Sequence, residues 1–242
     1  MKLDFLAFGA HPDDVELSCS GLLLIEKANG KKTGVIDLTE GEMGSRGTIQ
    51  TRYEESAAAS KIMELDVREN LQLPDGFFEN NKETQLKIIQ SIRKYRPDIV
   101  LCNAIDDRHP DHGRGAQLIS DAAFLSGLIK IETFEDGKPQ EHWRPKYVFH
   151  YIQDRYMIPD FLIDISDVFE KKLDSIKAYK TQFYNPDITG PETYISKPGF
   201  LERIINRDTT HGANIGVKFA EGFITKKKLG FKNLDNLIKE HT

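Results

Sequence analysis

The sequence has 242 residues, enough for one full domain or two small ones. It carries 33 Lys and Arg against 38 Asp and Glu, and this mild acidic excess argues against nucleic acid as the main partner, because phosphate binding needs a basic face. Cys19 and Cys102 cannot form a disulfide framework, and no apolar run approaches the roughly 18 residues of a membrane span. The N-terminal apolar run is also too short for a signal peptide, so we expect a soluble, cytoplasmic globular protein.

Short apolar runs alternate with segments of helical periodicity along the first half of the chain. The predicted strands are Leu3–Ala10, Thr33–Leu38, Asn70–Leu73 and Asp98–Asn103, and the predicted helices are Val15–Asn29, Thr51–Leu65, Glu83–Tyr95 and His112–Leu125. This alternation of strands and helices predicts an α/β, Rossmann-like fold. A mostly parallel sheet would be covered by helices on both faces.

The second half of the chain is less regular. It predicts strands over Lys146–Ile152 and Phe161–Ile165, helices over Val168–Tyr179 and Phe200–Phe219, and a loop over Pro186–Pro198. We interpret this half as a C-terminal extension, about residues 131–242, on a core of about residues 1–130. The predicted organisation is therefore a single domain over residues 1–242.

The first predicted strand ends in the turn G-A-H-P-D-D at residues 9–14. Ligands of open α/β sheets bind beyond the carboxyl ends of the strands, where a nucleotide-binding fold would carry G-x-G-x-x-G. Only Gly9 fits that pattern, and the turn instead supplies His11, Asp13 and Asp14. By itself, this acidic pair could merely complement the dipole of the following helix, with Pro12 at its first position.

The fourth predicted strand is followed by a second His-Pro-Asp turn, D-D-R-H-P-D-H, at residues 106–112. At one sheet edge, the two turns would bring three imidazoles and several carboxylates into one crevice. Catalytic zinc takes three such protein ligands and a water, and a hydrolase also needs a base that is not a ligand. The spacing leaves open which of Asp13 and Asp14 binds the metal, and which of His109 and His112 stays free as an acid.

Other charged segments carry weaker signals. The glycine-rich loop over residues 39–47 leaves the same sheet edge, so Arg46 and Arg52 are candidates for binding an anionic substrate group, with an ordinary surface loop as the alternative. The lysine run over residues 226–228 is more typical of a solvated face than of a nucleic-acid contact. Cys19 and Cys102 fit small core positions.

These motifs resemble the LmbE/PIG-L family of zinc-dependent N-acetylglucosamine deacetylases. The resemblance runs through A-H-P-D-D (10–14), T-x-G-E (39–42), R-G-T (46–48), R-x-x-E (52–55), R-H-P-D-H (108–112), Y-K-T-Q-F (179–183), E-T-Y-I (192–195) and I-G-V-x-F-A-E-G-F (215–223). The downstream motifs are similar to the branch that deacetylates N-acetylglucosaminyl-malate in bacillithiol biosynthesis. Ser45, where threonine is commoner, departs from the pattern but lies outside the metal motifs.

The resemblance implies one catalytic ion per chain, Zn²⁺ with Fe²⁺ as an alternative. Its ligands would be His11, Asp14 and His112, and Asp13 would be the general base. The implied reaction is hydrolysis of the N-acetyl amide of N-acetylglucosaminyl-malate, with release of acetate.

Five further residues receive roles from the same resemblance. His109 would be the acid that protonates the leaving amine, with Asp111 holding its ring. Tyr194 would donate its hydroxyl to the oxyanion. Arg52 and Arg108 would face the substrate, with a structural salt bridge as the alternative for each.

The implied partner is a small-molecule glycoside, without nucleic acid or membrane, in a homo-oligomer that relatives form as a hexamer. One alternative within the class is a deacetylase of another N-acetylglucosamine conjugate or of a chitooligosaccharide. An alternative from a different class is a Rossmann-like nucleotide-binding protein with a structural metal ion.

Overall fold

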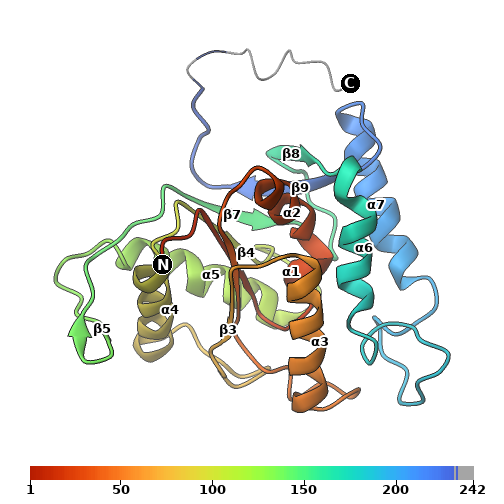
Figure 1. Cartoon of the computed structure of the whole chain (residues 1–242), viewed down its shortest axis with the longest axis horizontal. Coiled ribbons are helices and arrows are strands. Elements are labelled where there is room, and N and C mark those ends of the chain that lie inside the picture. The colour runs from red at the N-terminus through yellow and green to blue at the C-terminus, as the bar shows by residue number, and fades with distance from the viewer. Residues whose placement is uncertain (232, 234–242) are drawn as a thin grey trace.

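The computed structural model describes residues 1–231 and 233, so the end of the predicted extension, residues 234–242, lies outside the described residues (Figure 1). Its main sheet has seven strands in the order β3-β2-β1-β4-β7-β9-β8. These strands are β1 (Phe5–Gly9), β2 (Thr33–Asp37), β3 (Val67–Asn70), β4 (Ile99–Cys102), β7 (Tyr147–Tyr151), β8 (Phe161–Asp164) and β9 (Ala220–Thr225). The five strands from β3 to β7 are parallel, and β9 is antiparallel to both of its neighbours, which confirms the predicted fold class.

The side chains of β1 point alternately to the two faces of the sheet, and both faces are covered by apolar residues. Leu6 and Phe8 join the apolar cluster under α4 (Lys82–Tyr95) and α5 (Pro110–Leu125). Phe5 and Ala7 point the other way, toward α1 (Asp14–Ser18), α2 (Ser20–Ala28) and the end of α3 (Ile49–Ile62). Figure 1 shows these two helical layers on either side of the strands.

The C-terminal half adds a third apolar cluster. Its side chains come from the 3-10 turn η1 (Ser166–Val168), from α6 (Phe169–Lys177), which follows it, and from α7 (Phe200–Asn214). They pack against Leu17 of α1 and Ala59 of α3. A two-stranded hairpin, β5 (Phe134–Glu135) and β6 (Lys138–Pro139), stands apart from the main sheet. The extension therefore completes both the sheet and one of its helical layers.

The predicted single helix Val15–Asn29 is wrong, because the structure breaks it at Cys19 (φ −145°, ψ 14°). The Glu221 carboxylate of β9 accepts the backbone N–H groups of Gly21 and Leu22, each at 2.8 Å, and so satisfies the start of α2. A Cβ on Gly21 would lie 2.6 Å from the Ile165 side chain, so only glycine fits here.

Two other predicted boundaries are also corrected. The helix predicted over Phe200–Phe219 ends at Asn214, where Gly216 (φ +75°) turns the chain into β9. The strand predicted at Asn70–Leu73 lies earlier, at Val67–Asn70. β9 was not predicted: the predicted helix stops immediately before it, and no element was predicted over residues 220–225.

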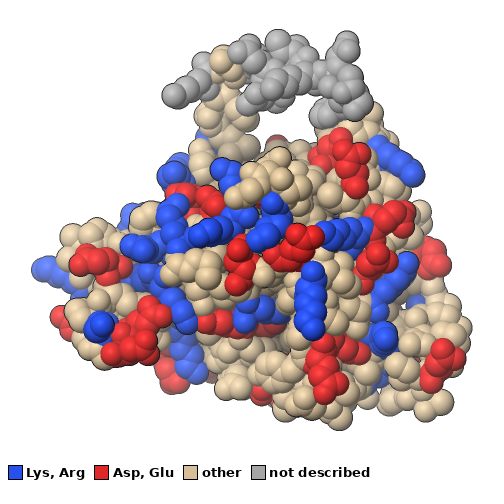
Figure 2. All heavy atoms as spheres, in the orientation of Figure 1, with Lys and Arg blue, Asp and Glu red and all other residues tan. Residues whose placement is uncertain are grey.

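No helix in the described ranges is both long enough and apolar enough to span a bilayer. Lysine and arginine side chains are interspersed with aspartate and glutamate over the face shown in Figure 2.

Candidate active site

The candidate site lies where the order of the strands reverses. β1 has β2 on one side and β4 on the other, so the turns that follow β1 and β4 leave the sheet beside each other. The Ala10 N–H donates to the Asn103 side-chain oxygen at 2.9 Å and joins the two turns directly. Between these turns and the C-terminal half lies a cleft of about 870 Å³, counted to its open mouth.

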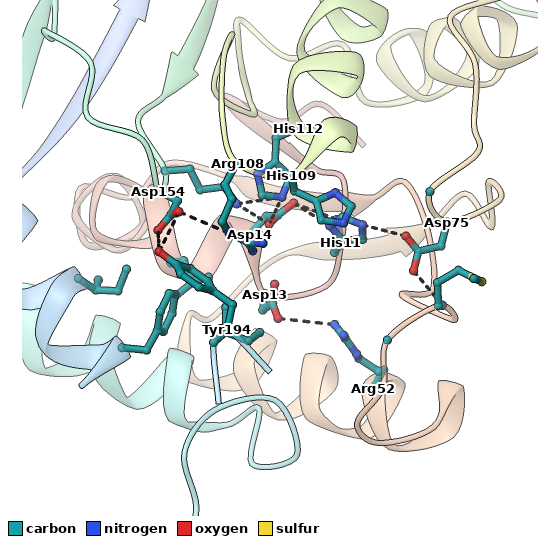
Figure 3. A pocket seen from close by; sticks show the side chains of 18 of the residues that line it. His11, Asp13, Asp14, Arg52, Asp75, Arg108, His109, His112, Asp154 and Tyr194 are labelled. Atoms are coloured by element: carbon teal, nitrogen blue, oxygen red, sulfur yellow. Dashed lines mark hydrogen bonds and ion pairs between the residues drawn. The ribbon is translucent and has the colours of Figure 1, made fainter. Parts of the chain in front are cut away.

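Both predicted His-Pro-Asp turns place side chains in this cleft (Figure 3). Asp14 lies between the two imidazoles that the resemblance assigned to the metal. Its Oδ1 is 3.2 Å from His112 Nε2, and its Oδ2 is 3.7 Å from His11 Nδ1. The structure therefore brings together the predicted ligand set of His11, Asp14 and His112.

A carboxylate lies behind each of these imidazoles. Asp107 Oδ2 is 2.5 Å from His112 Nδ1, and Asp75 Oδ1 is 2.9 Å from His11 Nε2. Each contact holds one ring nitrogen and leaves the other facing Asp14. Metal-binding histidines commonly have this second contact, which fixes the tautomer and the ring orientation.

Asp14 is itself held from three directions. Its Oδ2 accepts the His11 N–H and the Asn103 side-chain amide, both at 2.9 Å, and its Oδ1 accepts the Gln153 side-chain amide at 2.5 Å. These donors stabilise the charged form of the carboxylate. The ligand set thus fits a divalent cation, with two orientated imidazoles and one fixed carboxylate.

The charged groups of the ligand set shift one another's pKa values. Burial alone would lower the pKa of His11, but hydrogen bonding of its ring to the Asp111 and Asp75 carboxylates outweighs this effect and raises the pKa to about 10. Burial would also lower the pKa of His112, but other contributions outweigh it and raise this pKa to about 9. The charge of Asp14 is the largest of them. Burial would raise the pKa of Asp14, but the charge of His112 brings it well below its usual range. A bound cation would take the place of the protons on the imidazoles.

Asp13 is separated from the ligand set by its backbone conformation. Its φ of 116° is unusual for a residue with a side chain, and its carboxylate lies 3.5 Å from Arg52 Nη1. Burial raises the pKa of Asp13 to about 7, although Arg52 opposes this shift. A carboxylate with a pKa near neutrality is suited to accept and release a proton.

His109 also lines the cleft, with its ring centroid 4.6 Å from that of His11. Burial lowers the pKa of His109, and so do the charges of His11 and His112. Ring nitrogens of His11, His109 and His112 lie within 4.8 Å of one another. His109 is therefore close enough to the ligand set to serve as the predicted acid.

The predicted contact between the Asp111 carboxylate and the His109 ring is wrong. That carboxylate instead accepts from the Gly76 N–H at 2.8 Å and from Arg114 at 2.5 Å, and it lies 3.4 Å from His11 Nε2. Asp111 contacts the His109 ring only through its backbone N–H, which donates to Nδ1 at 3.3 Å. The reason is that Asp111 lies in the first turn of α5, whose buried side points toward the Gly76 loop.

Tyr194 reaches the mouth of the cleft from the loop that precedes α7. Its hydroxyl donates to the Asp154 carboxylate, with oxygen distances of 2.8 and 3.0 Å. The Arg108 guanidinium lies over the Tyr194 ring at 4.1 Å from its centroid and 3.5 Å from Asp154. Both predicted residues therefore line the cleft, but in this structure the Tyr194 hydroxyl is engaged by Asp154.

Arg52 lines the cleft but is bound by the protein. It donates to the Pro12 carbonyl at 2.9 Å and to the Gln182 side chain at 2.7 Å. Its side chain is only 9% exposed. These contacts favour the structural alternative, in which Arg52 holds the turn that carries Asp13.

Arg46 has a similar structural role. Its guanidinium donates to the backbone carbonyls of Thr181, Ile188 and Pro191, at 2.7, 3.3 and 3.2 Å. It therefore ties the glycine-rich loop over residues 39–47 to the loop that leads to Tyr194. The prediction of Arg46 as an anion-binding residue is not supported by this arrangement.

Sequence reasoning missed Asp75, Gln153 and Asp154. Asp75 follows β3 and Gln153 follows β7, so both leave the same sheet edge as the two His-Pro-Asp turns. The L-P-D-G turn at residues 73–76 was a usable signal for Asp75, because it places a carboxylate just after a strand. No comparable sequence signal marks Gln153 or Asp154.

Comparison with known proteins identifies similar deacetylases. Residues 6–123 match the GlcNAc-PI de-N-acetylase (PIG-L) family. The diacetylchitobiose deacetylase of Thermococcus kodakarensis is 27% identical over 189 residues, which cover 74% of this chain and 69% of the relative.

Solved structures share the fold over nearly the whole chain. The conserved protein TT1542 from Thermus thermophilus has 36% identity and a TM-score of 0.84, with 95% of this chain and 97% of that chain covered. The N,N'-diacetylchitobiose deacetylase from Pyrococcus horikoshii has a TM-score of 0.78 at 21% identity, covering 91% and 82%.

A hydrolytic N-deacetylase is the class of enzyme that this fold, this cluster and these relatives define. The chain belongs to the LmbE/PIG-L family of such enzymes.

Proposed function

We propose that this protein is a zinc-dependent hydrolase that removes the N-acetyl group from N-acetylglucosaminyl-malate. The observation that carries the proposal is the position of Asp14 within 3.7 Å of His11 and 3.2 Å of His112 in the cleft, with Asp13 lining the same cleft. Three ligands and a separate carboxylate are what a metal-assisted amide hydrolysis requires.

The chain's own groups account for the proton transfers. Zinc held by His11, Asp14 and His112 would supply a Lewis acid and lower the pKa of a water to ~7. Asp13 would be the group that accepts a proton from the water that attacks the acetyl carbonyl. His109 then donates a proton to the amine nitrogen, and acetate leaves.

The carbonyl oxygen gains negative charge during the attack. Tyr194, at the mouth of the cleft, is the candidate donor of a hydrogen bond to it, once its hydroxyl leaves Asp154. Removing such a donor typically costs ~10²–10³ in rate.

The malate aglycone is supported by the similarity of the downstream motifs to the bacillithiol branch. A second candidate, an N-acetylated chitooligosaccharide, is favoured by the two relatives named diacetylchitobiose deacetylase. Both candidates share the N-acetylglucosamine that carries the scissile amide, so the same machinery serves either one.

A direct test compares kcat/KM for N-acetylglucosaminyl-malate, diacetylchitobiose and free N-acetylglucosamine on the zinc-loaded protein. We expect the malate conjugate to be cleaved most efficiently. A clear preference for diacetylchitobiose would replace the malate assignment with the second candidate, and no acetate release from any of the three would overturn the proposal.

We further propose, from the same family resemblance, that the chain works in the cytoplasm as a homo-oligomer, with a hexamer as the expected state. Light scattering coupled to size-exclusion chromatography tests the oligomer. A monomeric mass at micromolar concentration would contradict it.

A further inference from the structure

The arginines around the cleft are of two kinds. Arg52 and Arg207 have side chains that are 9% and 13% exposed, and their guanidinium groups donate to carbonyl and side-chain oxygens of the protein. Arg108 and Arg203 are 43% and 60% exposed, and within the described residues their guanidinium groups make ion pairs but no hydrogen bonds. Arg52 Nε also has no hydrogen-bond partner in the part of the chain that the structure describes, but it is buried, so of these four residues only Arg108 and Arg203 present exposed N–H donors to a ligand.

These two arginines converge on one carboxylate. Arg108 Nε lies 3.5 Å from Asp154 Oδ2, and Arg203 Nη2 lies 3.7 Å from Asp154 Oδ1. Both guanidinium groups also lie near the Tyr194 ring, at 4.1 and 5.4 Å from its centroid. The Tyr194 hydroxyl donates to Asp154, next to Arg108 (Figure 3). We call Arg108, Asp154, Tyr194 and Arg203 the rim cluster.

The two arginines and the tyrosine of the rim cluster are residues that suit the binding of a carboxylate. In this structure the Asp154 side chain occupies that position. Two guanidinium groups and a phenol surround Asp154, one residue after Gln153, which holds Asp14. Arg108, Asp154 and Tyr194 line the cleft, and Arg203 lines the adjoining pocket, which shares Gln153 and Asp154 with it. We propose that Arg108 and Arg203 of the rim cluster form the subsite for a carboxylate on the aglycone, and that Asp154 takes the place of this carboxylate in the free enzyme.

The distances from Arg108 and Arg203 to Asp154 favour its replacement by a ligand carboxylate. Ion pairs of 3.5 and 3.7 Å with half-exposed arginines are longer than hydrogen bonds and contribute little to stability. A ligand carboxylate can instead approach a guanidinium fork to hydrogen-bond distance, where charge-assisted bonds are stronger. An anionic aglycone thus gains contacts that a neutral one cannot make.

The inference rests on the proposed function and changes one part of it. Arg52 was the other candidate for an anionic group, but the turn around Asp13 engages it. Arg203 was not singled out by any motif, because it lies in α7 and reaches the rim only through the fold. The specificity-determining pair is therefore Arg108 and Arg203.

The test uses two substrates, N-acetylglucosaminyl-malate and the neutral methyl N-acetylglucosaminide, on the zinc-loaded enzyme. The readout is the ratio of their kcat/KM values, which cancels general losses of activity. In Arg203→Gln we expect this ratio to fall by about tenfold. In Asp154→Asn we expect the KM for the malate conjugate to fall severalfold, because the competing carboxylate is gone.

Arg155→Gln is the matched control. Arg155 is 54% exposed and lines the same adjoining pocket as Arg203, but it pairs with Asp106 and not with Asp154, so its loss should leave the ratio unchanged. Unfolding temperatures of all variants identify any that fail to fold.

The outcomes distinguish failure of the proposed function from failure of the proposed carboxylate subsite. If the wild type releases no acetate from either substrate, the proposed function fails. If it cleaves them and Arg203→Gln keeps the wild-type ratio, the subsite is wrong. If Asp154→Asn instead raises the KM for the malate conjugate as much as Arg203→Gln does, Asp154 orientates the arginines and does not compete with the ligand.

Discussion

Adjacent aspartates have different surroundings in this site, and this difference separates their proposed roles. Asp14 accepts three hydrogen bonds and lies between two imidazoles, whereas Asp13 faces Arg52 across 3.5 Å and has a pKa raised to about 7 by burial. One carboxylate is fixed in its charged form, and the other is poised to exchange a proton. The sequence alone left these two assignments open.

Replacing Asp13 with asparagine tests this separation. We expect the variant to keep one ion per chain and to lose ~10²–10⁴ in kcat, because it lacks the base but not a ligand. Metal analysis of the purified protein, together with initial rates, gives both numbers. Asp14→Asn is the comparison and should lose the ion; an Asp13 variant that loses its metal would reverse the two assignments.

Asp107 is expected to act through His112, whose Nδ1 it contacts at 2.5 Å. Asp107→Asn should weaken metal affinity by ~10–100-fold, because the imidazole loses the carboxylate that orientates it. Activity should return at high zinc concentration, which distinguishes a positioning residue from a ligand. Zinc titration with a competing chelator measures the affinity.

The neighbouring Asp106 provides the control for Asp107. Its side chain is 68% exposed and pairs with Arg155 at the surface, so Asp106→Asn should bind zinc as the wild type does. Equal losses in both variants would mean that the general negative charge of the turn matters, and not the contact with His112.

The site residues divide by what their placement depends on. The meeting of the two His-Pro-Asp turns was predictable, because both follow strands whose carboxyl ends must lie at one edge of a parallel sheet. The choice of His11, Asp14 and His112 as ligands came from the family resemblance and not from the spacing. The contacts of Gln153 and Asp154 were not predictable, because they depend on how the C-terminal half packs against that edge. Arg52 and Arg46 were assigned to a ligand because nothing in the sequence shows which carbonyl groups a guanidinium will meet.

At the level of whole elements, the break between α1 and α2 depends on a strand two hundred residues away. Glu221 Oε1 accepts from Gly21 N–H and from the fully buried Lys172, and Asp208 also pairs with Lys172 at 2.7 Å. These contacts join α2, α6, α7 and β9. The local sequence of residues 15–29 has helical periodicity throughout, so the break could not be predicted from it.

Glu221→Gln should destabilise the protein by about 3 kcal/mol, because it removes one of two carboxylates that compensate a buried lysine. Urea unfolding followed by circular dichroism measures the change. The Lys171–Glu64 ion pair, with side chains 43% and 60% exposed, offers a control on the same helix. Glu64→Gln should show no measurable change, and equal stability of both variants would show that the buried network contributes nothing.

β9 shows where element prediction fails more generally. Its partners are β7 and β8, so its pairing is set by residues some 60 to 75 positions earlier in the chain. The apolar pattern of the preceding helix continues toward it without a strong local break other than Gly216. The parallel strands β1 to β4 were predictable because each of them is followed by its own helix.

For the whole molecule, the three apolar clusters form without using any of the proposed ligands. Removing the metal with a chelator should therefore abolish activity while leaving the far-ultraviolet circular dichroism spectrum unchanged. Added Zn²⁺ should restore turnover. Full activity in protein verified to be metal-free would refute the metal-dependent mechanism, and loss of the spectrum would show that the ion is also structural.

The backbone at Asp13 has a consequence for heat tolerance. A φ of 116° strains any residue with a Cβ by ~1–3 kcal/mol, whereas glycine adopts such angles freely. Asp13→Gly should therefore unfold at a higher temperature than Asp13→Ala, although both lack the carboxylate and alanine is normally the more stabilising residue. Differential scanning calorimetry of the two variants decides this, and a lower unfolding temperature for glycine would mean that the turn is unstrained. Directed evolution that selects only for a higher unfolding temperature would therefore tend to replace Asp13, the proposed base. Such a selection must also require catalytic activity.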